Sequence, residues 1–141
     1  MKTDIMKTLL FCAILFAASL LCLDRARAEE RNRAYATKVS GSLTNSMIVT
    51  TNSVWLDYAF ITNHGPAQEI LFFDSKTNQV DGAVSPIFCL MMQSGESKAI
   101  DFDGFPVQAG VTICNSTTTA NPFLKAIGAA DCFFLVRYHN P

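Results

Sequence analysis

The sequence has few of the residues that bind metals or perform catalysis. Its two histidines, His64 and His139, are far apart, and no C-x-x-C spacing occurs, so a zinc site is not expected. A G-x-S-x-G nucleophile turn and a phosphate-binding glycine loop are both lacking. No cysteine has a positive neighbour that would activate its thiol. We therefore expect a protein that is not an enzyme, with no catalytic residue, no metal ion and no cofactor.

An excess of positive charge is also lacking. Residues 29–141 contain seven Lys and Arg against ten Asp and Glu, and the positive residues are scattered apart from Arg31 and Arg33. Nucleic-acid-binding domains concentrate Lys and Arg on one face. We therefore expect no nucleic acid as a partner.

Helical periodicity is almost missing after residue 28. The one candidate, 120–130, is interrupted by Pro122 and Gly128. Short runs with period-two alternation and turn residues between them predict strands instead, with a further short edge strand at 34–39. The main runs are 46–51, 54–62, 69–74, 86–93, 98–103, 110–115 and 131–139. The pattern predicts an all-β fold, a single antiparallel β-sandwich of jelly-roll or Ig-like type with six to eight strands.

Turns and alternation give an expected core. Asn63 and the following His-Gly-Pro are typical of a turn in which the asparagine bonds its own backbone. Loops are expected at 75–85 and 116–130. Large apolar side chains on the strands are predicted to meet between the two sheets, where each contributes about 1.5–3 kcal/mol. These predicted core residues are Trp55, Phe60, Leu71, Phe73, Phe88, Ile100, Phe102, Ile113, Phe133 and Leu135.

The one long uncharged run lies at the N-terminus. Lys2 and Lys7 precede the run 9–23, and an Ala-x-Ala motif that ends at Ala28 follows it. A basic start, an apolar middle and small residues at the end predict a secretory signal peptide at 1–28, with an uncleaved anchor as the alternative. The run is shorter than the about 20 residues of a spanning helix. We expect a secreted protein, extracellular or on the cell surface, with the periplasm as the alternative and no stable membrane span in the mature chain.

The remaining chain divides into two parts. Residues 29–45 are polar and predict a flexible arm, in which Arg31, Arg33 and Tyr35 could contact a neighbouring subunit. Residues 46–141 predict the β-sandwich domain.

Three cysteines remain after the leader: Cys89, Cys114 and Cys132. An oxidising compartment allows a disulfide, and an odd number leaves one thiol unpaired or paired between chains. Cys114 and Cys132 are the disulfide candidate, since their runs could be neighbouring strands. Cys89 is the candidate for the unpaired or intermolecular thiol. Burial as a small hydrophobic residue is the alternative for at least one of them.

A series of motifs between Val54 and Tyr138 resembles a known family. In order they are YAFITNHG, ILFFD, Pro-Ile, SGES, DFDGF, GVTICNSTT and a closing FFLVRY. This order is similar to that of small β-sandwich structural proteins encoded in tailed-phage and prophage gene clusters. The resemblance implies a sandwich that assembles with copies of itself. The export signal and the three cysteines depart from the family and favour an extracellular product.

Two functions follow from these observations. The first is a secreted, non-enzymatic structural subunit, a homo-oligomer or polymer that forms an extracellular filament, coat or appendage. It is favoured by strands that are apolar on both faces, as in the first half of 54–62 and in 86–93, since such strands are central or covered by a neighbour. The alternative is a secreted carbohydrate- or surface-binding module that holds a glycan with the loops 75–85 and 116–130.

Overall fold

The computed structural model describes residues 34–117, 124–125 and 128–141. The folded unit begins at Tyr35 and contains ten strands. They are β1 (Tyr35–Val39), β2 (Ser46–Thr50), β3 (Val54–Asn63), β4 (Gln68–Asp74), β5 (Gly82–Ala83), β6 (Phe88–Met92), β7 (Ser97–Val107), β8 (Val111–Ser116), β9 (Leu124–Lys125) and β10 (Cys132–His139). The described residues contain no helix, so the all-β prediction is confirmed.

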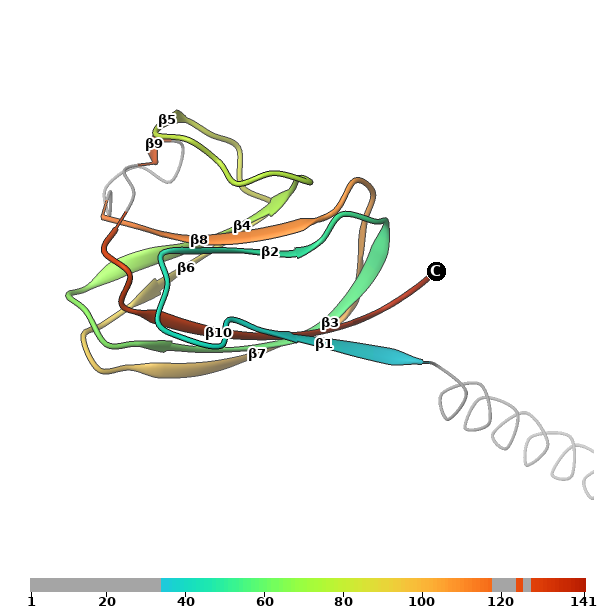
Figure 1. Cartoon of the computed structure of the whole chain (residues 1–141), viewed down its shortest axis with the longest axis horizontal. Coiled ribbons are helices and arrows are strands. Elements are labelled where there is room, and N and C mark those ends of the chain that lie inside the picture. Colours follow the sequence, from blue (N-terminus) through green and yellow to red (C-terminus); the bar gives the residue numbers. More distant parts are fainter. Residues whose placement is uncertain (1–33, 118–123, 126–127) are drawn as a thin grey trace, which may run out of the picture. The chain divides into compact units, whose positions relative to one another are not determined.

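Eight of the strands form two antiparallel sheets that face each other (Figure 1). Sheet A has the order β1-β10-β3-β7, and sheet B has the order β2-β8-β4-β6. Successive strands along the chain therefore alternate between the sheets in most steps, and the last strand lies between the first and the third. This connectivity is that of a jelly roll. The predicted antiparallel sandwich is confirmed.

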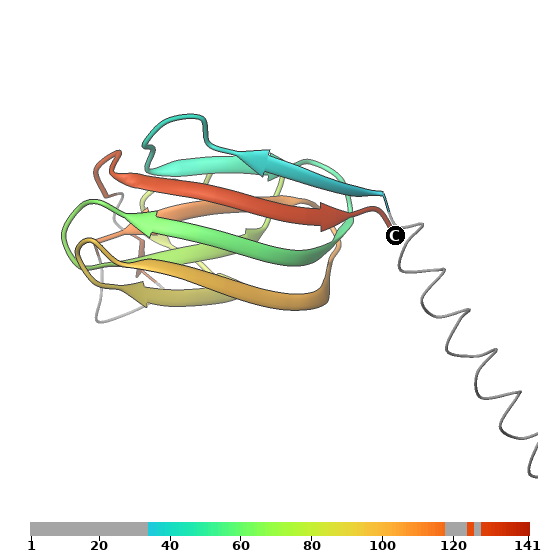
Figure 2. The same cartoon turned by 90° about the horizontal axis from the view of Figure 1, so that it is seen from below.

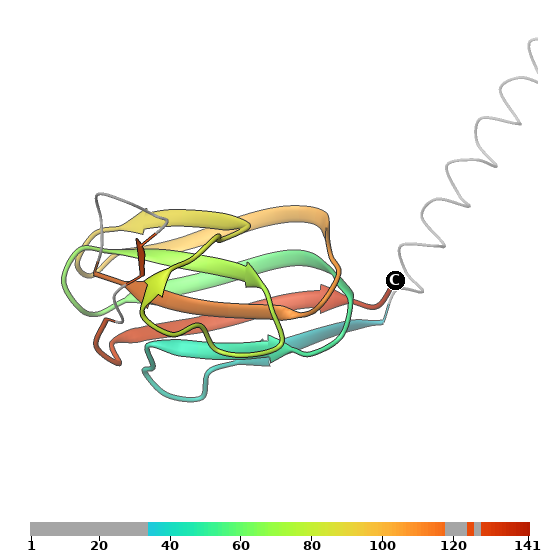
Figure 3. The same ribbon diagram turned by 90° about the horizontal axis from the view of Figure 1, so that it is seen from above.

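The short strands β5 and β9 pair with each other and lie over the outer face of sheet B (Figures 1 and 3). Both fall in segments that the sequence predicts as loops. Two residues per strand give too short a pattern for period-two alternation to reveal. The outer face of sheet A has no such cover from the described chain (Figure 2).

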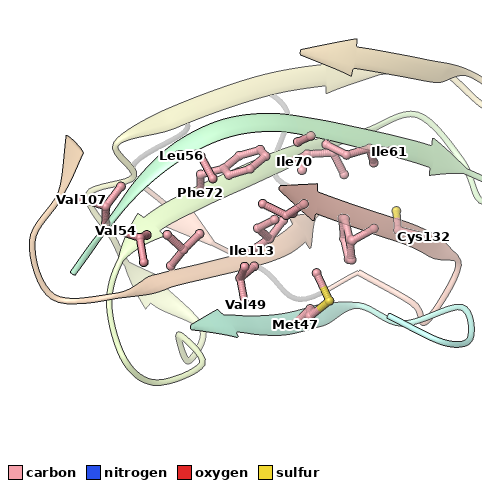
Figure 4. Close-up of a cluster of buried hydrophobic side chains, with 14 of the residues drawn as sticks. Met47, Val49, Val54, Leu56, Ile61, Ile70, Phe72, Val107, Ile113 and Cys132 are labelled. Atoms are coloured by element: carbon pink, nitrogen blue, oxygen red, sulfur yellow. The ribbon is translucent and has the colours of Figure 1, made fainter. Parts of the chain in front are cut away.

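The main core fills the space between the sheets (Figure 4). It takes alternate residues of every long strand, as period-two alternation requires. Its buried members are Met47, Val49, Val54, Leu56, Ala59, Ile61, Ile70, Phe72, Met92, Val107, Val111, Ile113, Cys132, Phe134 and Val136. Three phenylalanine rings, Phe72, Phe88 and Phe102, meet edge to face at the side of the core where the edge strands β6 and β7 lie, with centroids 5.3–5.7 Å apart.

Four of the predicted core residues belong to this core. Ile113 is buried in it, and Phe88, Ile100 and Phe102 pack against it. Two more, Leu71 and Phe73, are buried in a second cluster. That cluster lies on the other face of sheet B, together with Cys114.

The predicted core is wrong for the outer face of sheet A. Trp55 is 38% exposed, and Phe60, Phe133 and Leu135 are only half-buried. Their strands β3 and β10 carry apolar side chains on both faces, so alternation alone does not say which set points inward. The inward set is instead the smaller aliphatic residues with Phe134, which fit the narrow space between two sheets.

The N-terminal segment also differs in part from a flexible arm. Residues 35–39 form β1, which pairs with β10 over its whole length, in agreement with the predicted edge strand at 34–39. Tyr35 is therefore fixed on sheet A. Arg31 and Arg33 lie outside the described residues.

Candidate functional site on the outer face of sheet A

Three rows of side chains cross all four strands on the outer face of sheet A, and a fourth row, Phe133–Thr62–Ser97, crosses β10, β3 and β7. Directly paired residues of antiparallel strands point to the same face, so the registers of β1, β10, β3 and β7 define each row. The apolar row is Val39–Leu135–Phe60–Ala99, the charged row is Thr37–Arg137–Tyr58–Asp101, and the aromatic row is Tyr35–His139–Trp55–Pro106. The face thus has a charged row between two rows of apolar and aromatic side chains.

A buried hydrogen-bonded pair anchors the aromatic row. Asp57 occupies an irregularity in the register of β3 between Leu56 and Tyr58. Such a bulge re-aims one side chain. Both carboxylate oxygens of Asp57 lie 2.9 Å from Nδ1 of His139, and the two residues are 8% and 7% exposed. The contact joins the C-terminal end of β10 to β3.

Aromatic rings surround this pair. The Trp55 ring is stacked on the His139 ring, with centroids 6.3 Å apart and planes 8° apart. The Tyr35 ring meets His139 edge-on at 5.6 Å. Trp55 and Tyr35 remain 38% and 43% exposed. The row therefore presents a fixed aromatic surface to solvent.

Arg137 occupies the centre of the charged row. Its guanidinium lies 5.3 Å from the centroid of the Tyr35 ring and 5.6 Å from that of Tyr58. Cation–π contacts of this kind hold the cation over the rings and leave its N–H groups available to other partners. The side chain is exposed and oriented.

A bulge in β7 supports Trp55 from beneath. Asp103 and Gly104 both have positive φ, 49° and 73°, and the Asp103 N–H donates to Asp101 Oδ1 at 3.1 Å. A Cβ at Gly104 would lie 3.6 Å from Cε3 of Trp55. The backbone of β7 thus comes close to the indole ring and limits its movement.

A second cluster of functional groups is polar and lies between the sheets at the opposite end of sheet A. Asn63, fully buried at the end of β3, makes four hydrogen bonds. Its Nδ2 donates to the carbonyls of Pro66 and Gln93, and its Oδ1 accepts from the Gly65 N–H and from Gln68 Nε2. The bond from Gly65 confirms the turn predicted from Asn63.

Asp131 links the same cluster to sheet B. Its Oδ1 accepts from Gln68 Nε2 at 3.0 Å and from Asn115 Nδ2 at 3.2 Å. Asn115 Nδ2 also donates to the Ala129 carbonyl at 2.8 Å. Polar side chains from β3, β4 and β8, together with Asp131 just before β10, thus close this end of the sandwich, where water would otherwise reach the core.

Two oxygens of the cluster have no hydrogen-bond partner among the described residues: Gln68 Oε1 and Asn115 Oδ1. Both converge on Gly128, since a Cβ there would lie 2.8 Å and 2.7 Å from them. A side chain at position 128 would therefore clash with both oxygens, and glycine is the residue that fits there.

The three cysteines discussed above do not lie close enough to pair with one another. Cys114 lies on β8 of sheet B and Cys132 on β10 of sheet A, and the three described cysteines form no disulfide with one another. The predicted Cys114–Cys132 bridge is wrong because these strands are not neighbours. Cys114 also joins the cluster on the outer face of sheet B, while Cys132 points into the main core. Cys89 is exposed on the edge strand β6.

The thiols should differ in reactivity. Burial raises the pKa of Cys132 to about 11, a hydrogen bond from Asn115 opposes the shift, and the nearby Asp131 carboxylate adds to it. The reactive species is the thiolate. In the chain that begins at Glu29 we expect one thiol, Cys89, to react with a maleimide under native conditions, and three to react after denaturation. Mass spectrometry counts the adducts, and Cys89→Ser should remove the native adduct. Native labelling at Cys132 would contradict the buried thiol.

The one cleft we describe lies between the end of β4 and the β5 segment, on the side of sheet B. It has a volume of about 550 Å³ and is lined by Phe73, Asp74, Ser75, Gln79, Ala83, Val84, Ser85 and Ile87. The Asp74 carboxylate is committed to the backbone. Partial burial opposes its ionisation, but bonds from the N–H groups of Ala109, Gln108 and Gly110 outweigh this effect and lower its pKa. What remains for a ligand is a shallow wall of apolar and amide side chains.

In the described part of the chain, no group of three or more His, Cys, Asp or Glu side chains could hold a metal ion. No helix in that part is long and apolar enough to cross a membrane.

The protein is a jelly-roll sandwich in which the described chain leaves the outer face of sheet A exposed. No protein-family model and no curated protein matches the sequence. Among solved structures the chain is similar to the coat protein of Tobacco streak virus, with a TM-score of 0.43 and 7% identity over 78% of this chain and 88% of that chain. A structure of the coat protein dimer of the same virus gives a TM-score of 0.42 and 9% identity, over 79% of this chain and 88% of the other. The family resemblance to tailed-phage proteins stays a prediction.

Proposed function

We propose that this protein is a non-enzymatic structural subunit, exported by its N-terminal leader, that associates with copies of itself through the outer face of sheet A. The product would be an extracellular filament, coat or appendage. The observation that carries the proposal is the composition of that face, in which apolar and aromatic rows lie on both sides of Arg137.

The outer layer of a β-sandwich normally carries polar residues on its solvent side. Here Leu135 and Phe60 form the centre of an apolar row, and Val39 at its end is 42% exposed. Contiguous apolar surface of this kind marks an interaction site. Tyr, Trp and Arg, all present on the neighbouring rows, are the residue types that dominate the binding energy of protein interfaces.

The fold itself does not choose among functions, because jelly rolls serve both as capsid subunits and as lectins. The composition of the surface therefore supports the proposal. An aromatic row alone could stack on sugars. A polar glycan would gain little from an apolar row of four residues across the whole sheet, whereas a second protein surface would bury it.

Self-association is tested with the chain that begins at Glu29. We expect light scattering after size exclusion to show a mass above that of the monomer that rises with concentration, and negative-stain microscopy to show regular assemblies. Extra apolar burial drives this association, so it should persist in high salt. A monomer at the highest attainable concentration would overturn the proposal.

The cleft beside β5 favours a second candidate function, the binding of a glycan. It lies at the loop 75–85 that the sequence assigns to such a ligand, and Phe73, Gln79 and Ser85 supply an apolar wall and polar groups. A glycan array would test it. Binding that survives in a monomeric variant would place the ligand site apart from sheet A.

A further inference from the structure

We propose that two copies pack sheet A against sheet A about a two-fold axis that runs parallel to the strands, midway between β10 and β3. The inference rests on the proposed self-association and adds its geometry. It follows from the order of the three rows.

Such an axis keeps each row opposite itself but reverses its direction. Strand β10 of one copy then lies over β3 of the other, and β1 over β7. Leu135 faces the partner's Phe60, Arg137 faces the partner's Tyr58, and His139 faces the partner's Trp55. Two aligned sheets of this kind pack about 10 Å apart, at the small angle that their twist imposes.

The ends of the rows are complementary as well. Val39 faces the partner's Ala99, so a larger side chain meets a smaller one. Thr37 faces the partner's Asp101, so a hydroxyl donor meets a carboxylate acceptor. Tyr35 faces the partner's Pro106, so two flat ring surfaces meet. Each of the three rows therefore matches its own reverse.

The charges favour this axis. Within one chain the Arg137 guanidinium lies over the Tyr35 and Tyr58 rings, and Asp101 Oδ1 accepts a hydrogen bond from the Asp103 N–H. In the dimer Arg137 is displaced sideways by one strand, about 5 Å, from Asp101 of the partner subunit, across two sheets about 10 Å apart. Both side chains point into the space between the sheets, so the long arginine side chain reaches the carboxylate, and the two-fold axis forms the pair twice.

An axis perpendicular to the strands gives a worse match. If it passes through the charged row, it places Arg137 opposite the partner's Arg137, and it sets the apolar row against the aromatic row. Like charges brought together at an interface are destabilising. The parallel axis is therefore the one that the surface supports.

The test is a charge-complementation experiment with the whole exported chain. In a homodimer of Arg137→Glu, positions 101 and 137 of both copies are acidic, so four acids face one another. In a homodimer of Asp101→Arg the same four positions are basic. We expect each variant alone to self-associate at least tenfold more weakly than the wild type. A mixture of the two restores one acid–base pair at each position, so native mass spectrometry should detect the heterodimer.

Controls separate charge from folding. Lys76→Glu makes the same charge change as Arg137→Glu at an exposed loop position away from sheet A and should leave association unchanged. Asp101→Asn keeps the acceptor for the Asp103 N–H and should weaken association less than Asp101→Arg. Circular dichroism and a thermal melt show that each variant is folded.

The outcomes are distinct. Weak single variants with a restored heterodimer support the two-fold axis. Association that neither variant changes would overturn this geometry while leaving the proposed self-association in place. A wild-type monomer would overturn both. Single variants that fail but do not rescue each other would exclude the parallel axis, because that axis brings position 137 within one strand of position 101 of the other copy, whereas the perpendicular axis leaves the two positions two strands apart.

Discussion

Replacing Phe134 by alanine should lower the free energy of unfolding by about 3–5 kcal/mol, while the same change at the adjacent Phe133 should cost less than about 2 kcal/mol. Phe134 is fully buried in the main core, and Phe133 is half-buried on the outer face of sheet A. Truncation of Phe134 leaves a cavity between two sheets that cannot collapse. Urea denaturation of the two variants measures the difference.

The pair is matched in residue type, strand and secondary structure, so only the face differs. Equal losses at the two positions would contradict the inward direction assigned to β10. A larger loss at Phe133 would mean that the inward and outward sets are exchanged along that strand.

Replacing Asn63 by alanine should cost about 3–5 kcal/mol, since the change removes one buried side chain but leaves four groups without their partner. Those groups are the carbonyls of Pro66 and Gln93, the Gly65 N–H and Gln68 Nε2. Each unsatisfied buried group costs about 1–3 kcal/mol, and water admitted to the site offsets part of the sum. Thermal and urea unfolding both report the loss.

Thr62 provides the control for Asn63. It is the preceding residue on β3, and its hydroxyl makes an exposed contact with Ser97 at 3.0 Å. Thr62→Ala should change the stability by less than about 1 kcal/mol. A loss at Asn63 no larger than that at Thr62 would show that the polar cluster does not hold the end of the sandwich together.

The strands and their antiparallel layering could be predicted because a half-buried strand shows its period in the sequence. The run 98–103 is an example, since acidic residues alternate with Ile100 and Phe102. The face of β10 could not be predicted, because Phe133 and Phe134 are equally apolar. The structure resolves the choice through the register with β3, a long-range property.

The candidate site was harder to predict than the fold. Asn63 was recognised as a turn residue because its bond to Gly65 is local. The other partners of Asn63 come from distant strands, and the pair of His139 with Asp57 joins residues 82 positions apart. Nothing in the sequence near either residue indicates the other. The bulge that turns Asp57 toward His139 also gives no local signal.

The position of the last strand has a consequence for how the protein reaches its fold. Strand β10 is the centre of sheet A, and both β1 and β3 bond to it. Until residues 132–139 have been synthesised, β1 has no strand to pair with, and β3 can pair only with β7. Closure of the sheet then brings together β1 and β10, the first and last described strands, and contacts of such long range form slowly. A nascent chain therefore cannot complete sheet A before residues 132–139 have been synthesised, and a chain shortened before Cys132 would leave β1 without its pairing strand.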